Sequence, residues 1–259
     1  MTRLPLAVGL TVREVRSRYQ ESALGLLWTL LTPLLLIAIY SFFFGRVLGL
    51  GGGAAGGVPF ALHLFSGYLA WDVFGRTVGE GPDILTGNRA ILTKVRVPLE
   101  TVFHARVLFQ LFHASLAGLV LFAAMAVEGI APGPEVLLLP VLLACLGLFT
   151  AGAAMIAGVL GLFLKDLKEV VAVVLLAWLF ATPIFYYEAG LGLGEGTLLG
   201  TLYRSNPMYW FVTLMRACTV EPGAGHPLAW VLVVLGSYLA YRLGRLMLAR
   251  SRSLVLDLL

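Results

Sequence analysis

Two ionisable side chains stand inside an otherwise apolar run. Asp72 and Arg76 are four residues apart within 60–78, so on a helix they face each other one turn apart. Ionisable groups in membrane segments often mark ion or substrate paths, and they also pair with one another. We expect Asp72 and Arg76 to form a local ion pair, and a role in a transport path is the alternative.

The other residues whose side chains could take part in catalysis do not form a catalytic pattern. The sequence contains no G-x-x-x-x-G-K-[ST] stretch and no H-E-x-x-H stretch, so neither a P-loop nor a zinc-protease site is expected. The glycine-rich run 49–57 follows no predicted strand and indicates a flexible loop rather than a phosphate-binding loop. Any ATP must therefore be bound by another chain. We expect no metal site, and we interpret the dispersed histidines as structural or interfacial: His63, His104, His113 and His226.

The composition indicates a chain that lies in lipid. Of the 259 residues, 59% are hydrophobic and 12% are charged, far from the average of soluble domains. The net charge is +4, but the basic residues form short clusters between apolar runs. This pattern is typical of anchoring at a membrane surface and not of nucleic-acid binding. Cys145 and Cys218 lie in apolar segments without metal-type spacing, and we expect them to pack as small residues.

The apolar runs predict an all-α membrane protein with six transmembrane helices. A helix needs about 20 mainly apolar residues to cross about 30 Å of hydrocarbon, and the runs lack the alternation of barrel strands. The predicted spans are Leu26–Gly45, Phe60–Val78, Thr101–Val127, Val136–Leu164, Val170–Tyr187 and Leu228–Leu246.

The distribution of positive charge predicts the orientation of these spans. With alternating loops, 15 of the 18 lysines and arginines fall on the side of the N-terminus. Only Arg46, Arg204 and Arg216 fall on the other side. The positive-inside rule therefore places both termini in the cytoplasm.

Two further segments differ from simple spans. Residues 5–20 combine an apolar stripe with charged residues off that stripe, which predicts an amphipathic helix in the membrane interface. Residues 188–226 contain the apolar segment Tyr209–Val220, which ends before Glu221-Pro222-Gly223. It is too short to span, so we expect short re-entrant helices between spans 5 and 6.

Five ordered motifs cover nearly the whole chain. They resemble the signatures of ABC-2 type permeases that export polysaccharides, with Lys165 and Thr182 as mild departures from the family pattern, where arginine and serine are usual. The motifs are Arg18-Tyr19, Ser22, Leu24-Gly25, Trp28 and Pro33-Leu34; Asn88, Ile91-Leu92, Lys94 and Pro98; Lys165-Asp166; Thr182-Pro183-Ile184 and Tyr186; and Asn206-Pro207 with Arg216.

The resemblance implies a single ABC-2 type transmembrane domain over residues 1–259 and a bacterial cytoplasmic membrane location. It further implies a homodimer bound to two separate ATPase subunits, which would bind the ATP and Mg²⁺, and a lipid-linked polysaccharide such as O-antigen, teichoic acid or capsule as cargo. The chain itself would need no cofactor and would not be an enzyme. Membrane lipids are expected partners, and nucleic acid is not.

The resemblance also assigns roles to residues. The cytoplasmic loop 80–100 would be the coupling helix that contacts the ATPase, whereas an ordinary positive-inside loop is the alternative without the resemblance. Arg13, Arg16 and Arg18 could bind the pyrophosphate of a lipid-linked sugar bidentately, or hold anionic headgroups. The external gate would include Pro183, Asn206, Pro207 and Arg216. The expected coupling residues are Asn88, Arg89, Ile91, Leu92, Lys94 and Arg96.

Aromatic residues are candidates for the wall of a glycan channel, because sugar rings pack on aromatic faces. An interfacial aromatic belt is the alternative for each of them. The candidates are Tyr40, Phe43, Tyr68, Trp71, Phe74, Tyr186 and Tyr187.

Two other classes of function stay open at this point. An ABC-2 exporter of a small drug or lipid would share the architecture. A secondary carrier or a membrane scaffold is the alternative from another class, but spans 1, 4 and 5 contain no carboxylate of the kind that couples ions to transport.

Overall fold

The computed structural model describes residues 6–12, 27–47, 58–94, 97–186 and 198–258, and within these ranges it contains helices and no strand. The all-α prediction is therefore confirmed for the described chain.

A short helix covers 6–12. The elements that follow are α2 (Leu27–Tyr40), the π-helix η1 (Ser41–Val47), α3 (Phe60–Gly79), α4 (Gly81–Gly87), α5 (Arg89–Lys94), α6 (Glu100–Val127), the 3-10 helix η3 (Pro134–Leu138), α7 (Leu139–Phe163), α8 (Leu167–Phe180), α9 (Leu198–Arg204), α10 (Pro207–Ala217), α11 (Pro227–Arg250) and α12 (Arg252–Leu258).

Each predicted span corresponds to a helix, but not all of these helices have the length and composition of a span. Among the described residues, three helices are long and apolar enough to cross a membrane: Glu100–Val127, Pro134–Phe163 and Pro227–Arg250. They match the predicted third, fourth and sixth spans. The other three predicted spans fall on α2 with η1, on α3 and on α8, so the total of six stays a prediction.

The predicted fifth span extends too far. Helix α8 ends at Phe180, and turns and bends follow it as far as Tyr186. Pro183 has no backbone N–H to donate, and the residue before a proline is disfavoured in the helical region. The Thr182-Pro183 sequence therefore ends the helix instead of interrupting it.

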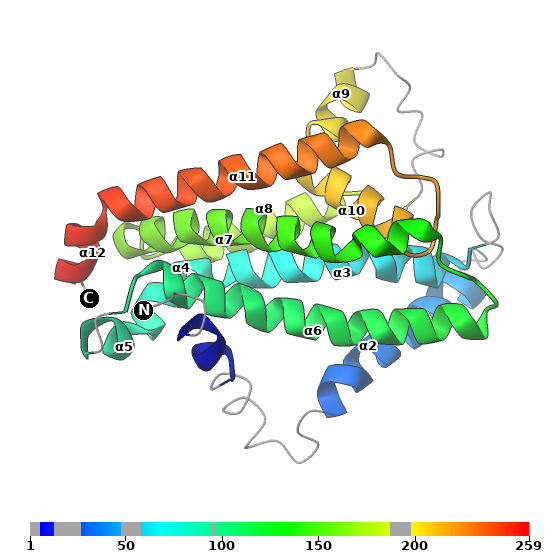
Figure 1. Cartoon of the computed structure of the whole chain (residues 1–259), viewed down its shortest axis with the longest axis horizontal. Helices are drawn as coiled ribbons and strands as arrows, with labels where there is room; N and C mark the ends of the chain where they lie inside the picture. The colour runs from blue at the N-terminus through cyan, green and yellow to red at the C-terminus, as the bar shows by residue number, and fades with distance from the viewer. Residues whose placement is uncertain (1–5, 13–26, 48–57, 95–96, 187–197, 259) are drawn as a thin grey trace.

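Helix α3 is the central element of the bundle. Most of its residues are buried, and it lies between α6, α7 and α10 (Figure 1). By contrast, α8 has no buried residue, and its Val173 side chain is 69% exposed. An exposed apolar face of this kind suits contact with lipid or with another subunit.

Helices α7 and α11 cross at very short range because of two glycines. A Cβ atom on Gly152 would lie 2.6 Å from the backbone nitrogen of Tyr241, and one on Gly244 would lie 2.8 Å from the Cα atom of Gly152. Small residues at such a crossing allow two membrane helices to pack backbone against backbone.

The short elements separate into two groups at opposite ends of the long helices. In Figure 1, α4, α5 and α12 lie at one end, whereas α9 and α10 lie toward the other. The segment 6–12 belongs to the first end, since the Thr11 hydroxyl donates a hydrogen bond to the Ala105 carbonyl at 3.1 Å. At the second end, the Gly223 amide donates to the Glu135 carboxylate at 3.1 Å. The N-terminal helix and the C-terminal helix thus lie at the same end, as an even number of spans requires.

Candidate functional site

The segment 80–100 is not an open loop but two short helices attached to the bundle. Helix α4 starts with Gly81 and Pro82, and a proline in the first turn is favourable because its missing N–H has no partner there. A Cβ atom on Gly81 would lie 2.8 Å from the Cβ atom of Ala157, and one on Gly161 would lie 2.6 Å from the Cα atom of Pro82. Small residues of α7 therefore allow α4 to come into close contact with α7.

Ion pairs attach the same segment to two more helices. Glu80 pairs with Arg106, which comes from α6 and is nearly buried. Asp83 pairs with Lys168 of α8 at 2.6 Å. The second pair is exposed and contributes little stability, but it shows that α4 faces the start of α8. We name α4 and α5 together the platform.

The predicted coupling residues divide into anchors and exposed groups. Leu92 is 3% exposed and packs with Ile84 and Leu85 in the core, and the Asn88 amide donates to the Ile84 carbonyl at 2.8 Å. Ile91 is half-buried, whereas Arg89 and Lys94 are exposed. Arg96 lies outside the described residues, as do Arg13, Arg16 and Arg18. Exposed cations on a rigid base are suited to contact a partner protein.

At the opposite end, Asn206 joins α8 to α10. Its side-chain oxygen accepts hydrogen bonds from the Trp178 ring nitrogen at 2.7 Å and from the Met208 amide at 2.9 Å. Its amide nitrogen donates to the Ala181 carbonyl at 3.1 Å and to the Thr182 hydroxyl at 3.0 Å. Asn206 caps the N-terminus of α10 and also holds the end of α8. The structure thus brings Thr182 and Asn206 together from two separate motifs.

Arg216 joins this cluster from the last turn of α10, at the opposite end of the helix from Asn206. Its guanidinium is buried and donates to the carbonyl oxygens of Pro183, Ile184 and His63. The carbonyls lie in the turn after α8 and in α3, so Arg216 connects three elements. Pro183, Asn206 and Arg216 of the predicted gate therefore lie in one polar cluster, with Pro207 in the first turn of α10. Their role as a gate stays a prediction.

His63 and Glu221 extend the cluster toward the surface. The His63 Nδ1 atom donates to the Glu221 carboxylate at 2.5 Å. Burial opposes ionisation of this carboxyl group, but the hydrogen bond from His63 and the charge of Arg216 hold the pKa of Glu221 below its ordinary value. Burial raises the pKa of the nearby Cys218 thiol to about 11, which is consistent with a packing residue rather than a nucleophile.

Sequence reasoning did not identify Trp178, His63 or Glu221 as members of this cluster. The only local signal was the spacing of Trp178 and Thr182, which places them on one face of a helix. His104, His113 and His226 also have hydrogen-bond partners, and the interpretation of the histidines as structural stays a prediction. Among the described residues, no group of His, Cys, Asp or Glu side chains is arranged to hold a metal ion.

We expect Asn206→Asp to lower the stability of the protein by about 1–3 kcal/mol, because aspartate keeps the acceptor and loses both donated hydrogen bonds. The carboxylate would also face the Ala181 carbonyl. The midpoint of thermal unfolding in detergent measures the effect. Asn88→Asp is the matched control, since it removes a single hydrogen bond at a half-buried site. Equal midpoints for the two variants would contradict the bridging role of Asn206.

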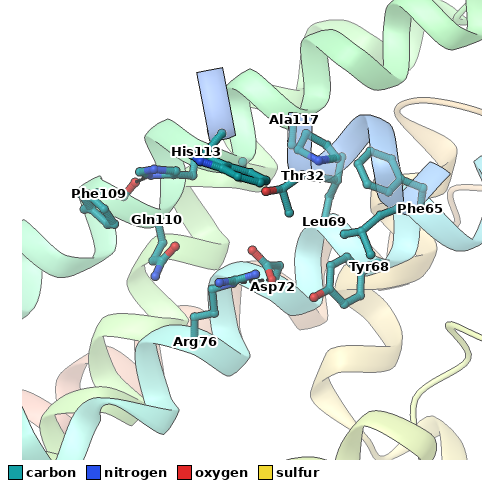
Figure 2. A pocket seen from close by; sticks show the side chains of 14 residues that line it. Thr32, Phe65, Tyr68, Leu69, Asp72, Arg76, Phe109, Gln110, His113 and Ala117 are labelled. Carbon is teal, nitrogen blue, oxygen red and sulfur yellow. Dashed lines mark hydrogen bonds and ion pairs between the residues drawn. The ribbon is translucent and has the colours of Figure 1, made fainter. Parts of the chain in front are cut away.

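A cavity of about 320 Å³ opens between α2, α3 and α6. Figure 2 shows Tyr68, Asp72 and Arg76 of α3 on one side and Gln110 and His113 of α6 on the other. The predicted ion pair is confirmed, since the Arg76 Nε atom donates to the Asp72 carboxylate at 2.6 Å. In this cavity, charged and polar side chains meet between three of the predicted spans.

The aromatic candidates occupy different environments. Trp71 and Phe74 are buried and pack edge to face with Trp178, so their rings belong to the core of this chain. Tyr68 lines the cavity. Phe43 is exposed, Tyr40 is half-buried, and the Tyr186 hydroxyl donates to the Phe180 carbonyl. Tyr187 lies outside the described residues. Their roles in a channel stay predictions.

A helical bundle with several long apolar helices and polar elements at its two ends is the architecture of a multi-pass membrane protein. The family model for ABC-2 type transporters matches residues 7–220. The chain therefore belongs to the ABC-2 type transporter family, whose members are transporter components and not enzymes.

Characterised relatives support this assignment over most of the chain. The O-antigen export system permease protein RfbA of Myxococcus xanthus is 33% identical over 218 residues, which cover 83% of this chain and 80% of that protein. A Klebsiella pneumoniae protein of the same name is 27% identical over 183 residues, or 70% of this chain and 68% of that protein.

Proposed function

We propose that this chain is the transmembrane permease subunit of an ATP-driven exporter that moves a lipid-linked polysaccharide across the bacterial inner membrane. The similarity to two O-antigen export permeases along most of both chains carries this proposal. The absence of a P-loop in the sequence supports it, because the energy source must then be a separate ATPase subunit.

The platform provides the site where that ATPase subunit would bind. Its core side is fixed by Leu92 and by the close contact with α7, and its outer side carries Arg89 and Lys94. A force applied to these exposed residues would pass directly to α6, α7 and α8. With Arg96, these groups form the proposed coupling surface.

The arrangement of the ends supports a topology of six spans with both termini in the cytoplasm. The platform, the segment 6–12 and α12 share one end, and this is the end where the basic residues cluster. Residues 188–226, with α9 and α10, would form the external gate, and residues 5–20 would lie in the cytoplasmic interface. Two copies of the chain would enclose the path, with Arg13, Arg16 and Arg18 near the pyrophosphate of the lipid carrier.

Export in cells tests the proposed function. The chain and its neighbouring ATPase gene are introduced into a bacterial strain whose own O-antigen permease and ATPase genes are deleted. We expect surface polysaccharide to return, and to be lost again when the P-loop lysine of the ATPase is replaced. A second measurement uses the purified chain in liposomes with an ion gradient and no ATPase. Cargo movement under those conditions would overturn the proposal.

A further inference from the structure

In the proposed topology of six spans, the cavity between α2, α3 and α6 lies near the middle of the membrane. Asp72 is twelve residues beyond the start of α3, which is about 18 Å at a rise of about 1.5 Å per residue. Gln110 is ten residues beyond the start of α6, or about 15 Å. The hydrocarbon core is about 30 Å thick, so both residues stand far from either headgroup region. Polar groups at this depth are costly, and they commonly serve binding or transport.

The charges in the cavity cancel each other. Asp72 and Arg76 are one turn apart and joined by a hydrogen bond of 2.6 Å. Beyond this bond, the Arg76 guanidinium has further N–H donors, and the Asp72 carboxylate has further lone pairs that can accept hydrogen bonds. The pair therefore offers donors and acceptors side by side without net charge. This suits a ligand with neutral hydroxyl groups better than an anion, which would have to displace the carboxylate from Arg76.

Gln110 provides a second pair of donor and acceptor groups. Its side chain is 4% exposed and lines the cavity. Within the described part of the chain, its amide makes no hydrogen bond. The amide opens onto the cavity, where water or a ligand can complete its hydrogen bonds. A ligand hydroxyl can both donate to the amide oxygen and accept from the amide nitrogen, and would satisfy it.

Aromatic rings supply the remaining walls. Trp28, Tyr68 and Phe109 line the same cavity, and their flat apolar faces can stack on the C–H side of a sugar ring. The volume of about 320 Å³ is at the lower end of the range for small-molecule pockets, about 300–1,000 Å³. The cavity thus combines neutral hydrogen-bonding pairs with ring faces in a space suited to a small ligand.

We infer that this cavity is a binding subsite for one uncharged sugar unit of the exported chain, with Asp72, Arg76 and Gln110 contacting its hydroxyls and Trp28 and Tyr68 stacking on its ring. The inference rests on the proposed function, since that function supplies a glycan as cargo. It adds a site within a single subunit that reads hydroxyl groups and not the phosphates of the carrier lipid.

Saturation-transfer NMR tests the subsite with the permease and its ATPase together in lipid nanodiscs. Sugar-headed detergents are avoided because they would compete. The probes are the methyl glycosides of glucose, galactose, mannose and rhamnose, and inorganic pyrophosphate is followed separately by its phosphorus signal. We expect at least one glycoside to bind the wild-type complex and pyrophosphate not to bind in the cavity.

Two substitutions are expected to weaken glycoside binding but to differ in their effect on pyrophosphate binding. Gln110→Met keeps the side-chain length and removes the amide, and it should weaken glycoside binding about fivefold to tenfold. Asp72→Asn leaves the charge of Arg76 uncompensated, so it should weaken glycoside binding and create pyrophosphate binding. Ser115→Ala is the control on α6, because its hydroxyl bonds the Leu111 carbonyl and does not line the cavity. Trp28→Ala, which removes a stacking ring at an exposed position, replaces Gln110→Met if the latter does not assemble.

The outcomes separate the subsite from the function of the whole protein. Absent glycoside binding in the wild type would overturn the subsite even if the chain restores export. Glycoside binding that is unchanged in Asp72→Asn and in Gln110→Met, or in the replacement variant Trp28→Ala, would overturn it as well. Pyrophosphate binding to the wild type that is lost with Arg76→Gln would overturn it in favour of an anion site. Failure of the wild-type chain to restore surface polysaccharide would instead overturn the proposed function.

Discussion

Replacing Gly152 by leucine is expected to prevent assembly of the helical bundle. The added side chain would meet backbone atoms of Ala240 and Tyr241 on α11, and backbone cannot move aside as a flexible side chain can. Overpacking of this kind costs about 3 kcal/mol or more, a large part of the stability of a typical domain. The measurement is the fraction of a fluorescent fusion that elutes as a single species from size exclusion in detergent.

Gly236 provides the matched control for this substitution. It lies on α11 as well, but a Cβ atom there would have no heavy atom within 4 Å. Gly236→Leu should therefore leave the elution profile unchanged. Leucine also has a better helix propensity than glycine. If Gly152→Leu eluted like Gly236→Leu, the close crossing of α7 and α11 would be wrong.

Much of the fold follows from the sequence because apolar runs in lipid must be helical. The centres of the predicted spans all fall on helices. Helix ends depend on local chemistry, which the hydrophobic pattern alone does not include. Thr182-Pro183 ends α8, whereas the apolar run predicts a span as far as Tyr187. Pro82 and Asp83 are typical residues for the first turn of a helix, and the resemblance implied a coupling helix within 80–100, where the structure has α4 and α5.

The site could be predicted only in part, since its geometry depends on contacts between distant segments. The motifs identified Thr182, Asn206 and Arg216 separately, and the structure shows that they form one cluster. Nothing in the local sequence indicates that Trp178 bonds Asn206 or that Gly152 touches α11. Gln110 was not predicted at all, because the isolation of its amide in a cavity depends on how α2, α3 and α6 pack.

Reversing the charge of the platform is expected to separate the permease from its ATPase. Arg89 and Lys94 are exposed on α5, whereas Leu92 between them is buried. The double variant Arg89→Glu and Lys94→Glu therefore changes the surface without disturbing the anchor. A tenfold loss of affinity corresponds to about 1.4 kcal/mol of binding free energy. Like charges facing each other across an interface cost at least this much. We expect at least a tenfold loss of co-purified ATPase, with the spans still inserted.

The comparison that decides this prediction uses other cations at the same end of the bundle. Arg250 and Arg252 are exposed at the end of α11 and the start of α12, so Arg250→Glu with Arg252→Glu makes the same change in net charge away from the platform. If only the platform variant loses the ATPase, the contact is local to α5. If both variants lose it equally, the ATPase responds to the overall charge of this end. Unchanged association in the platform variant would remove the coupling role from Arg89 and Lys94, and the close contact of α4 with α7 would then be purely structural.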